Sequence, residues 1–351
     1  MKRAVIAALA MLSSLMPARA GSFNEKPCHV DGFETPVRCV SVMVPLDYES
    51  PNGAQITGTA AIVPATTARP AADPLIVLAG GPGQAATGMG PWLDSAFKPT
   101  RQGRDIVLLD VRGTGWSGAL TCPFSLTATA VGVEAMRRDA AECARRAGDK
   151  APYYSASEVV EDIERLRRAL SYSKVNLWGG SFGTRIAQHY ARKYGVHLRA
   201  VVLDGATPVE ESIFVTGPVT GQRALDRLFD DCAIDTDCAA AFPHLRADLD
   251  VLLARAEQST LIVEAPDPRG GRVQSIAIDR DGIVGLVRGA LYVGMTRALA
   301  PYAIAQGERG NLKPLLALGA ATAEWSADTM ALGALLGIVC AEDLAKALKA
   351  D

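Results

Sequence analysis

The most informative part of the sequence is the run Val175-Asn176-Leu177-Trp178-Gly179-Gly180-Ser181-Phe182-Gly183. Its first four residues form a short apolar segment typical of a buried strand. The Gly-x-Ser-x-Gly pattern that follows keeps the next turn small, and a helix N-terminus sets a positive dipole near the serine oxygen. Beyond the turn, apolar side chains recur on one helix face, at Ile186, Ala187, Tyr190 and Tyr194. We therefore predict a nucleophile elbow with Ser181 as the nucleophile; the alternative is a glycine-rich turn without chemistry.

Similar apolar runs occur on both sides of this turn, at Leu75–Ala79, Ile106–Leu109 and Ala200–Leu203. Short, nearly unbroken apolar runs are typical of parallel strands covered on both faces by helices. Ser155–Glu158 has the spacing of a capping box, which predicts a helix start. The buried face of that helix is expected at Val159, Ile163, Leu166 and Leu170. Alternating strands and helices indicate an α/β fold with a mostly parallel sheet.

The two ends of the chain depart from this alternation. Val40–Asp47 and Gln55–Val63 are strand-like and predict an antiparallel hairpin at the start of the sheet. From about Thr207 the sequence is mostly helical, at Gln222–Ala233, Leu245–Gln258, Asp281–Gln306 and Ser326–Cys340, with strand-like Leu261–Ala265 and Val273–Ile278. We therefore expect the N-terminal part of a core in residues 21–206. Residues 207–351 would hold a helical cap over the sheet's ligand end and the start of the return to the core.

Residues 1–20 have the pattern of a secretory signal. Lys2 and Arg3 precede an apolar run, and Ala18-Arg19-Ala20 provides a cleavage site. The run is shorter than the ~20 residues that a bilayer-spanning helix needs, which argues against the alternative of a membrane anchor. We expect cleavage after Ala20 and export to the periplasm or the medium.

Composition limits the partners and ligands of the chain. A net charge of −2 gives no field that would collect nucleic acid or an anionic membrane, so neither partner is expected. No cysteine has the Cys/His spacing of a zinc site, and we expect neither a metal nor a cofactor. The seven cysteines have near neighbours that would pair in an oxidising compartment as Cys28–Cys39, Cys122–Cys143 and Cys232–Cys238, although sequence alone does not fix connectivity. Cys340 is left over, and a buried unpaired thiol is the alternative there.

Acyl transfer needs hydrogen-bond donors aimed at the oxyanion. Gly80-Gly81-Pro82-Gly83 directly follows the strand ending at Ala79, where a second strip of donors is expected. We predict the backbone amides of Gly81 and Phe182 as the oxyanion hole; the alternative for the glycine run is a plain turn.

Three ordered motifs give the chain a family resemblance. Leu78–Gly83 resembles the His-Gly-Gly-Pro-Gly segment of the prolyl iminopeptidase and tripeptidyl aminopeptidase family of serine peptidases, with Ala79 where many relatives carry histidine. Asp110–Ser117 resembles that family's Asp-x-Arg-Gly-x-Gly-x-Ser, and Gly179–Thr184 resembles its Gly-Gly-Ser-Tyr-Gly-Thr. Further matches to the secreted tripeptidyl branch lie at Val44–Tyr48, Val202–Gly205 and Cys340–Asp343. The resemblance covers nearly all of the chain after the signal.

The resemblance implies an α/β-hydrolase fold with a helical cap insertion. It also implies a serine-type aminopeptidase that recognises a peptide's free N-terminus and releases one to three residues through an acyl-enzyme on Ser181. Acidic residues near the cap would pair with the substrate ammonium group. Among Glu210, Glu211, Glu342 and Asp343 we select Glu342; the alternative for each is a solvated surface carboxylate. Arg112 is expected to brace the floor of the site through charge-assisted hydrogen bonds; the alternative is an ordinary surface arginine.

A catalytic base is hard to find in the sequence. In this fold the order is serine, then acid, then histidine. His189 lies too far along the elbow helix, His197 lies at the opposite end of the sheet, and His244 lies in the helical block. Asp204 could be an acid, but it would have no base to orient. Relatives continue after the Cys-Ala-Glu-Asp stretch with two strands that carry Asp and His, so we expect the last strands of the sheet, and with them the complete triad, to be missing. An esterase or amidase on the same fold and a catalytically incomplete homologue therefore remain as alternatives.

Overall fold

The computed structural model describes residues 23–122, 133–266, 271–327 and 330–349. The predicted signal, residues 1–20, lies outside them. Within these ranges, none of the helices combines the length and the apolar character needed to cross a bilayer.

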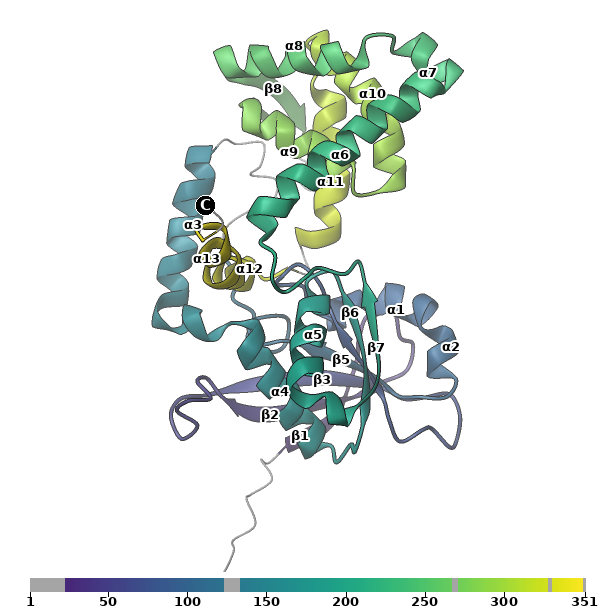
Figure 1. The fold of residues 1–351 in the computed structure, drawn as a ribbon, viewed down its shortest axis with the longest axis vertical. Coiled ribbons are helices and arrows are strands. Elements are labelled where there is room, and N and C mark those ends of the chain that lie inside the picture. The colour runs from purple at the N-terminus through teal and green to yellow at the C-terminus, as the bar shows by residue number, and fades with distance from the viewer. Residues whose placement is uncertain (1–22, 123–132, 267–270, 328–329, 350–351) are drawn as a thin grey trace, which may run out of the picture.

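A seven-stranded sheet forms the lower half of the molecule in Figure 1, in the order β1-β2-β3-β5-β4-β6-β7. The strands are β1 (Phe23–Cys28), β2 (Val37–Pro45), β3 (Gln55–Val63), β4 (Leu75–Leu78), β5 (Ile106–Asp110), β6 (Val175–Gly180) and β7 (Leu198–Asp204). β1, β2, β3 and β5 pair antiparallel, whereas β5, β4, β6 and β7 pair parallel. The predicted entry hairpin and the parallel β5-β4-β6-β7 part of the sheet are confirmed, and β1, β2 and β3 extend the sheet with three antiparallel pairs.

Helices cover the two faces of the sheet. The helices of this part of the chain are α1 (Gly90–Ala96), α2 (Lys98–Arg101), α3 (Val133–Ala147), α4 (Ala156–Ala169) and α5 (Gly183–Tyr194), with short 3₁₀ turns at Thr87–Met89, Gly148–Tyr153 and Gly195–His197. Of these, α3 lies beside residues 332–338 and not over the sheet. α4 and α5 pack on one face, where Ile163, Ile186 and Tyr190 are fully buried as predicted. Leu93 of α1 belongs to the apolar cluster on the other face. The core is therefore a sheet between two helical layers.

The second half of the chain forms a helical region, residues 213–327, above the sheet in Figure 1. It contains α6 (Ile213–Ile234), α7 (Thr236–Ala241), α8 (Leu245–Gln258), β8 (Leu261–Pro266), β9 (Val273–Ile278), α9 (Arg280–Ala290), α10 (Gly294–Glu308) and α11 (Lys313–Ala327). These helices enclose an apolar cluster of their own. The return segment, residues 330–349, then brings α12 (Leu332–Ile338), a π-helical turn (Val339–Leu344) and α13 (Ala345–Ala347) back to the core, where Ile338 joins the α4/α5 cluster.

Several expectations need correction. β7 was expected to be covered on both faces, but Val202 and Leu203 are 51% and 40% exposed. Among the described residues β7 pairs only with β6 and lies at the edge of the sheet. β1 was not predicted, since its polar sequence Phe-Asn-Glu-Lys-Pro-Cys lacks an apolar run. α11 was not predicted either, and the helix expected over Asp281–Gln306 is interrupted between α9 and α10.

The three predicted disulfides are confirmed, at Cys28–Cys39, Cys122–Cys143 and Cys232–Cys238. Cys340 is an unpaired thiol, but it is exposed rather than buried. Disulfides persist in oxidising compartments, so the pattern indicates that the chain folds in one.

Candidate active site

Ser181 lies at the turn between β6 and α5. Its backbone φ is +51°, in the left-handed region that residues other than glycine rarely adopt, and its side chain is exposed. The amide of Ser181 donates to the carbonyl of Asp204 at 2.8 Å, and the amide of Thr184 donates to the carbonyl of Ser181 at 2.9 Å. The backbone of Ser181 is strained and hydrogen-bonded to Asp204 and Thr184, and its side chain is open to solvent. This is the geometry of a nucleophile elbow.

Gly183 allows the nucleophile helix to approach the sheet closely. A Cβ atom added at Gly183 would lie 2.2 Å from the carbonyl oxygen of Leu78, at the end of β4. This approach brings the first turn of α5 against the loop that follows β4. The backbone of α5 therefore packs so closely against the end of β4 that position 183 must be a glycine.

The glycine loop, residues 80–84, runs beside the nucleophile. A Cβ atom added at Gly80 would lie 3.0 Å from Cβ of Ser181 and 3.5 Å from its Oγ. Among the residues that the structure describes, neither the amide of Gly81 nor that of Phe182 donates to a protein acceptor. Two unsatisfied amides on the segments that flank an exposed serine provide what an oxyanion hole needs. Their role as oxyanion donors stays a prediction.

Asp110, at the end of β5, fixes the segment that follows the glycine loop. Its buried carboxylate accepts hydrogen bonds from the amide of Thr87 at 3.0 Å, the Thr87 hydroxyl at 2.7 Å and the amide of Trp116 at 2.9 Å. Burial raises the pKa of Asp110, and these hydrogen bonds oppose the rise. Asp110 therefore joins the loop after β4 to the loop after β5.

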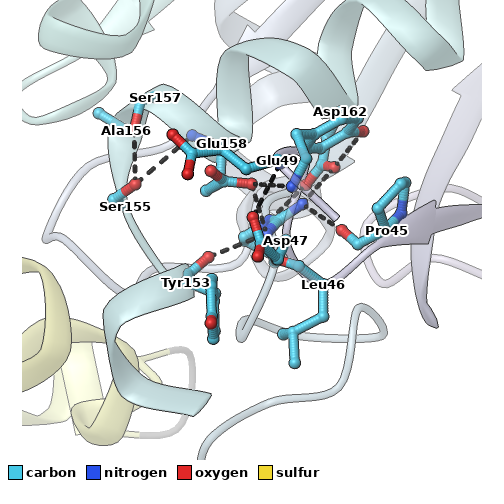
Figure 2. Close-up of polar contacts among 12 residues, drawn as sticks. Pro45, Leu46, Asp47, Glu49, Tyr153, Ser155, Ala156, Ser157, Glu158 and Asp162 are labelled. Carbon is cyan, nitrogen blue, oxygen red and sulfur yellow. Dashed lines mark hydrogen bonds and ion pairs between the residues drawn. The ribbon is translucent and has the colours of Figure 1, made fainter. Parts of the chain in front are cut away.

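Arg112, in the loop after β5, is the buried centre of a hydrogen-bond hub. It donates two bonds to Asp162, at 2.7 and 2.6 Å, and further bonds to the carbonyl oxygens of Leu46, Tyr153 and Pro45. Figure 2 shows these partners converging from β2, α4 and the turn before α4. Burial opposes the charge on Arg112, but the hydrogen bonds and charge of Asp162 prevail and raise the pKa of Arg112. The expected bracing by charge-assisted hydrogen bonds is present.

Tyr48 completes this hub. Its hydroxyl donates to Asp162 at 2.9 Å, and the guanidinium of Arg112 lies 5.6 Å from its ring centroid. Burial and the neighbouring Asp162 charge raise the pKa of Tyr48 above its usual value. The phenol therefore stays protonated and serves as a hydrogen-bond donor in the hub.

The return segment docks onto the glycine loop. The amide of Ala331 donates to the carbonyl of Gly83 at 2.7 Å, and Gln84 and Met330 form an antiparallel bridge. A Cβ atom at Gly83 would lie 2.6 Å from the carbonyl oxygen of Ala331, so only glycine permits this contact. The chain that returns from the helical region thus rests directly on the predicted oxyanion loop.

Thr184 connects the elbow to the segment after β7. Its buried hydroxyl donates to the carbonyl of Ser181 at 2.6 Å and accepts from the amide of Thr207 at 2.9 Å. Sequence reasoning did not select Thr184, although its place in the Gly-Gly-Ser-x-Gly-Thr motif marked it. It also did not select Asp110 for this role, although the Asp-x-Arg-Gly motif begins there.

The four histidines, all described by the structure, do not supply a base for Ser181. None of them is hydrogen-bonded to Ser181. His189 lies in the second half of α5, and burial lowers its pKa; His197 lies 3.9 Å from Glu164, before β7. His244 precedes α8 in the helical region, and His29 follows β1. Among the described residues, the nucleophile lies beside the predicted donor amides, and the carbonyl oxygen of Asp204 accepts a hydrogen bond from its amide. No imidazole is hydrogen-bonded to it.

The candidate ammonium ligands occupy different environments. Glu210 is exposed and paired with Arg192, whereas Glu211 contributes its carbonyl oxygen to Arg185. Glu342 accepts a hydrogen bond from the amide of Ala156 at 2.6 Å, and Asp343 is buried against Arg185. The substrate-binding role of Glu342 stays a prediction.

Comparisons with known proteins agree with this geometry. The sequence profile of the α/β hydrolase fold family matches residues 73–233. The tripeptidyl aminopeptidase of Streptomyces coelicolor is 27% identical over 215 residues, which cover 56% of this chain and 40% of that protein. Carboxylesterase B of Mycobacterium tuberculosis is 32% identical over 269 residues, 66% of this chain and 49% of that protein. Serine protease Hip1 of the same species is 27% identical over 227 residues, 57% of this chain and 42% of that protein.

The matches therefore span less than half the length of each of these relatives. Their names describe peptide and ester hydrolysis, both of which use an activated serine in this architecture. The family profile begins just before β4, includes the elbow and ends in the last turn of α6. The strand order, the Ser181 turn and the profile agree that the chain has the α/β-hydrolase fold.

Proposed function

We propose that the chain belongs to an exported serine hydrolase that forms an acyl-enzyme on Ser181. The observation that carries the proposal is an exposed serine in a left-handed turn, flanked by the unsatisfied amides of Gly81 and Phe182. Attack by Oγ of Ser181 on a carbonyl carbon would move negative charge onto the carbonyl oxygen, where two amides would stabilise it. The serine proton would pass to a base other than the four histidines, since none of them is hydrogen-bonded to Ser181.

We propose peptides with a free N-terminus as the substrate, with release of one to three residues. Similarity to a tripeptidyl aminopeptidase supports this choice, as do the three motifs shared with its family. The predicted signal and the three disulfides support export. A short-chain ester is the second candidate substrate, favoured by the 32% identity to a carboxylesterase.

The nucleophile is tested by covalent labelling. The wild-type chain should react with a fluorophosphonate probe, and Ser181→Ala should abolish the reaction, because the probe needs the serine oxygen. Added imidazole should accelerate labelling of the wild type by supplying the missing base. Labelling that persists in Ser181→Ala, or that His244→Ala removes, would contradict the proposed site.

The substrate class is tested with matched compounds. A tripeptide nitroanilide with a free amino group should react faster than its N-acetylated form and faster than a nitrophenyl ester of a short acid. Equal rates for free and acetylated peptides would refute recognition of the N-terminus. Turnover of the ester alone would favour the esterase.

A further inference from the structure

Two adjacent carboxylates in the return segment each bind the first amide of a helix. Oε1 of Glu342 accepts from the amide of Ala156, the first residue of α4, at 2.6 Å. Oδ1 of Asp343 accepts from the amide of Ile213, the first residue of α6, at 2.9 Å. Carboxylates at helix N-termini satisfy orphan amides and oppose the positive end of the helix dipole. One segment thereby contacts a helix of the core and the first helix of the helical region.

Asp343 is also paired with a residue of the nucleophile helix. Nη1 of Arg185 lies 2.9 Å from both carboxylate oxygens of Asp343, and the two side chains are 2% and 3% exposed. Nη2 of Arg185 donates to the carbonyl of Glu211 at 2.7 Å, and the Ser212 hydroxyl donates to the carbonyl of Asp343 at 2.8 Å. Arg185 of α5 is thus bonded both to the segment before α6 and to the return segment.

The burial of this pair gives it a larger role than a surface ion pair. Removing one partner of a buried ion pair leaves the other charge without water or a counter-charge, which is strongly destabilising. Arg192 and Glu210 provide a contrast at the same junction: they also join α5 to the segment before α6, but they are 59% and 65% exposed. Exposed pairs of this kind contribute little.

We propose that Arg185 and Asp343 are positioning residues that hold the start of α6, and hence the helical region, in a fixed place relative to Ser181. Arg185 follows Ser181 by about one helical turn on the helix that begins at the elbow, and its side chain bonds that helix to the segment before α6. Glu342 anchors the same segment to α4. The proposal rests on the proposed function only in taking Ser181 as the reactive group. It offers a structural role for Glu342 and Asp343, two of the four carboxylates considered above as ligands of the substrate ammonium group.

A double-mutant cycle tests the buried pair. Arg185→Met and Asp343→Asn should each raise the unfolding equilibrium constant by roughly 10²–10³-fold, because each leaves a buried charge unpaired. The double variant should be closer to wild type than the product of the two single effects. The matched cycle uses Arg192→Met and Glu210→Gln, whose effects should multiply to within about twofold. Independent effects of Arg185→Met and Asp343→Asn would overturn the proposal.

Positioning is separated from stability by reagent size. At a temperature where every variant is folded, a small sulfonyl fluoride should label Ser181 of wild type and Asp343→Asn at similar rates. A fluorophosphonate carrying a tripeptide should change its rate by at least fivefold in Asp343→Asn but not in Glu210→Gln. Equal changes for both reagents would show a merely structural role and overturn the proposal.

Hydrogen exchange gives a readout that does not need a reactive serine. Amides of residues 211–216 should exchange faster in Arg185→Met and Asp343→Asn than in wild type, while the Arg192→Met variant should match wild type. Unchanged exchange would overturn the proposal. If neither reagent labels wild-type Ser181, the proposed function fails, and the exchange and double-mutant results still decide the role of the pair.

Discussion

The core and the helical region are built from different interactions. Within the described side chains, the buried polar residues are Thr87, Asp110, Arg112, Thr114, Ser117, Asp162, Glu164, Arg167, Asn176, Thr184, Arg185, Ser212, Thr296 and Asp343. Of these, Thr296 alone lies in the helical region, where its hydroxyl donates to the nearby carbonyls of Ala290 and Val293. The rest of that region's interior is an apolar cluster.

This difference indicates where geometry is strictly specified. A buried polar group must find its partners at fixed distances and angles, so it fixes the loops that it joins. An apolar interior tolerates substitutions that conserve volume, and a single well-ordered packing is lost only gradually as such substitutions accumulate. The loops around Ser181 are held by polar groups, whereas the helical region can vary in sequence while keeping its shape.

The largest effect is expected from removing the buried charge of Arg112 in the core. Arg112→Met should cost about 3–5 kcal/mol of unfolding free energy, because Asp162 would stay buried without its partner. Urea denaturation measures the loss, with Arg192→Met as the exposed control. A loss below about 1 kcal/mol, the range of a surface pair, would remove the distinction between the regions.

The second test addresses the apolar interior of the helical region. Leu252 of α8 is fully buried, so Leu252→Ala should cost about 2–5 kcal/mol by leaving a cavity. Leu252→Met should cost less than about 1.5 kcal/mol, because it conserves volume. Labelling of Ser181 by a small reagent should be the same in both variants under folding conditions. A labelling defect in Leu252→Met would show that the helical region also sets the geometry of the serine.

The third test compares two glycines. Gly83→Ala should both strain a φ of +104° and push the return segment, whose Ala331 carbonyl would lie 2.6 Å from the new Cβ. Gly118 has a φ of +74° and no atom within 4 Å of an added Cβ, so Gly118→Ala isolates the strain of about 1–2 kcal/mol. Gly83→Ala should be the less stable variant in urea and should slow labelling of Ser181. Equal behaviour would show that the return segment does not support the glycine loop.

The smallest effect is expected from acid. Burial favours the neutral form of Glu164, but hydrogen bonds from Arg167, Arg168 and Tyr190 prevail and lower its pKa from 4.5 to about 2. The carboxylate therefore contributes stability that is complete above pH 4.5 and is lost as the pH falls toward 2. Glu164→Gln should flatten the fall of the unfolding free energy across that window. An unchanged pH profile would contradict the assignment of this acid sensitivity to the core.

Local sequence patterns predicted where strands and helices form but not what packs against each of them. The apolar runs of β4, β5 and β6 and the face of α5 were predicted because burial repeats at a regular spacing. The same kind of run in β7 predicted a covered strand, yet exposure depends on what lies beside a strand, which its own residues do not encode.

The features of the candidate site likewise fall into those that adjacent residues predict and those that depend on the fold. The turn at Ser181 was predicted from adjacent residues, and the structure gives it the strained backbone of an elbow. The bond between Asp110 and Thr87 spans 23 positions, and the pair Arg185–Asp343 spans 158. Such partners are brought together only by the finished fold, so no local pattern indicates them. The polar framework of the site was therefore largely invisible in the sequence.

The disulfides have a consequence for biogenesis. Each one joins cysteines that are consecutive in the chain, separated by 11, 21 and 6 residues, and none links the core to the helical region. For a polypeptide threaded N-terminus first into an oxidising compartment, each thiol would meet its correct partner before the next cysteine emerged. Native pairing would then arise by simple sequential oxidation, with little demand on an isomerase. Cys340 would emerge after these six thiols, when the three pairs had already closed.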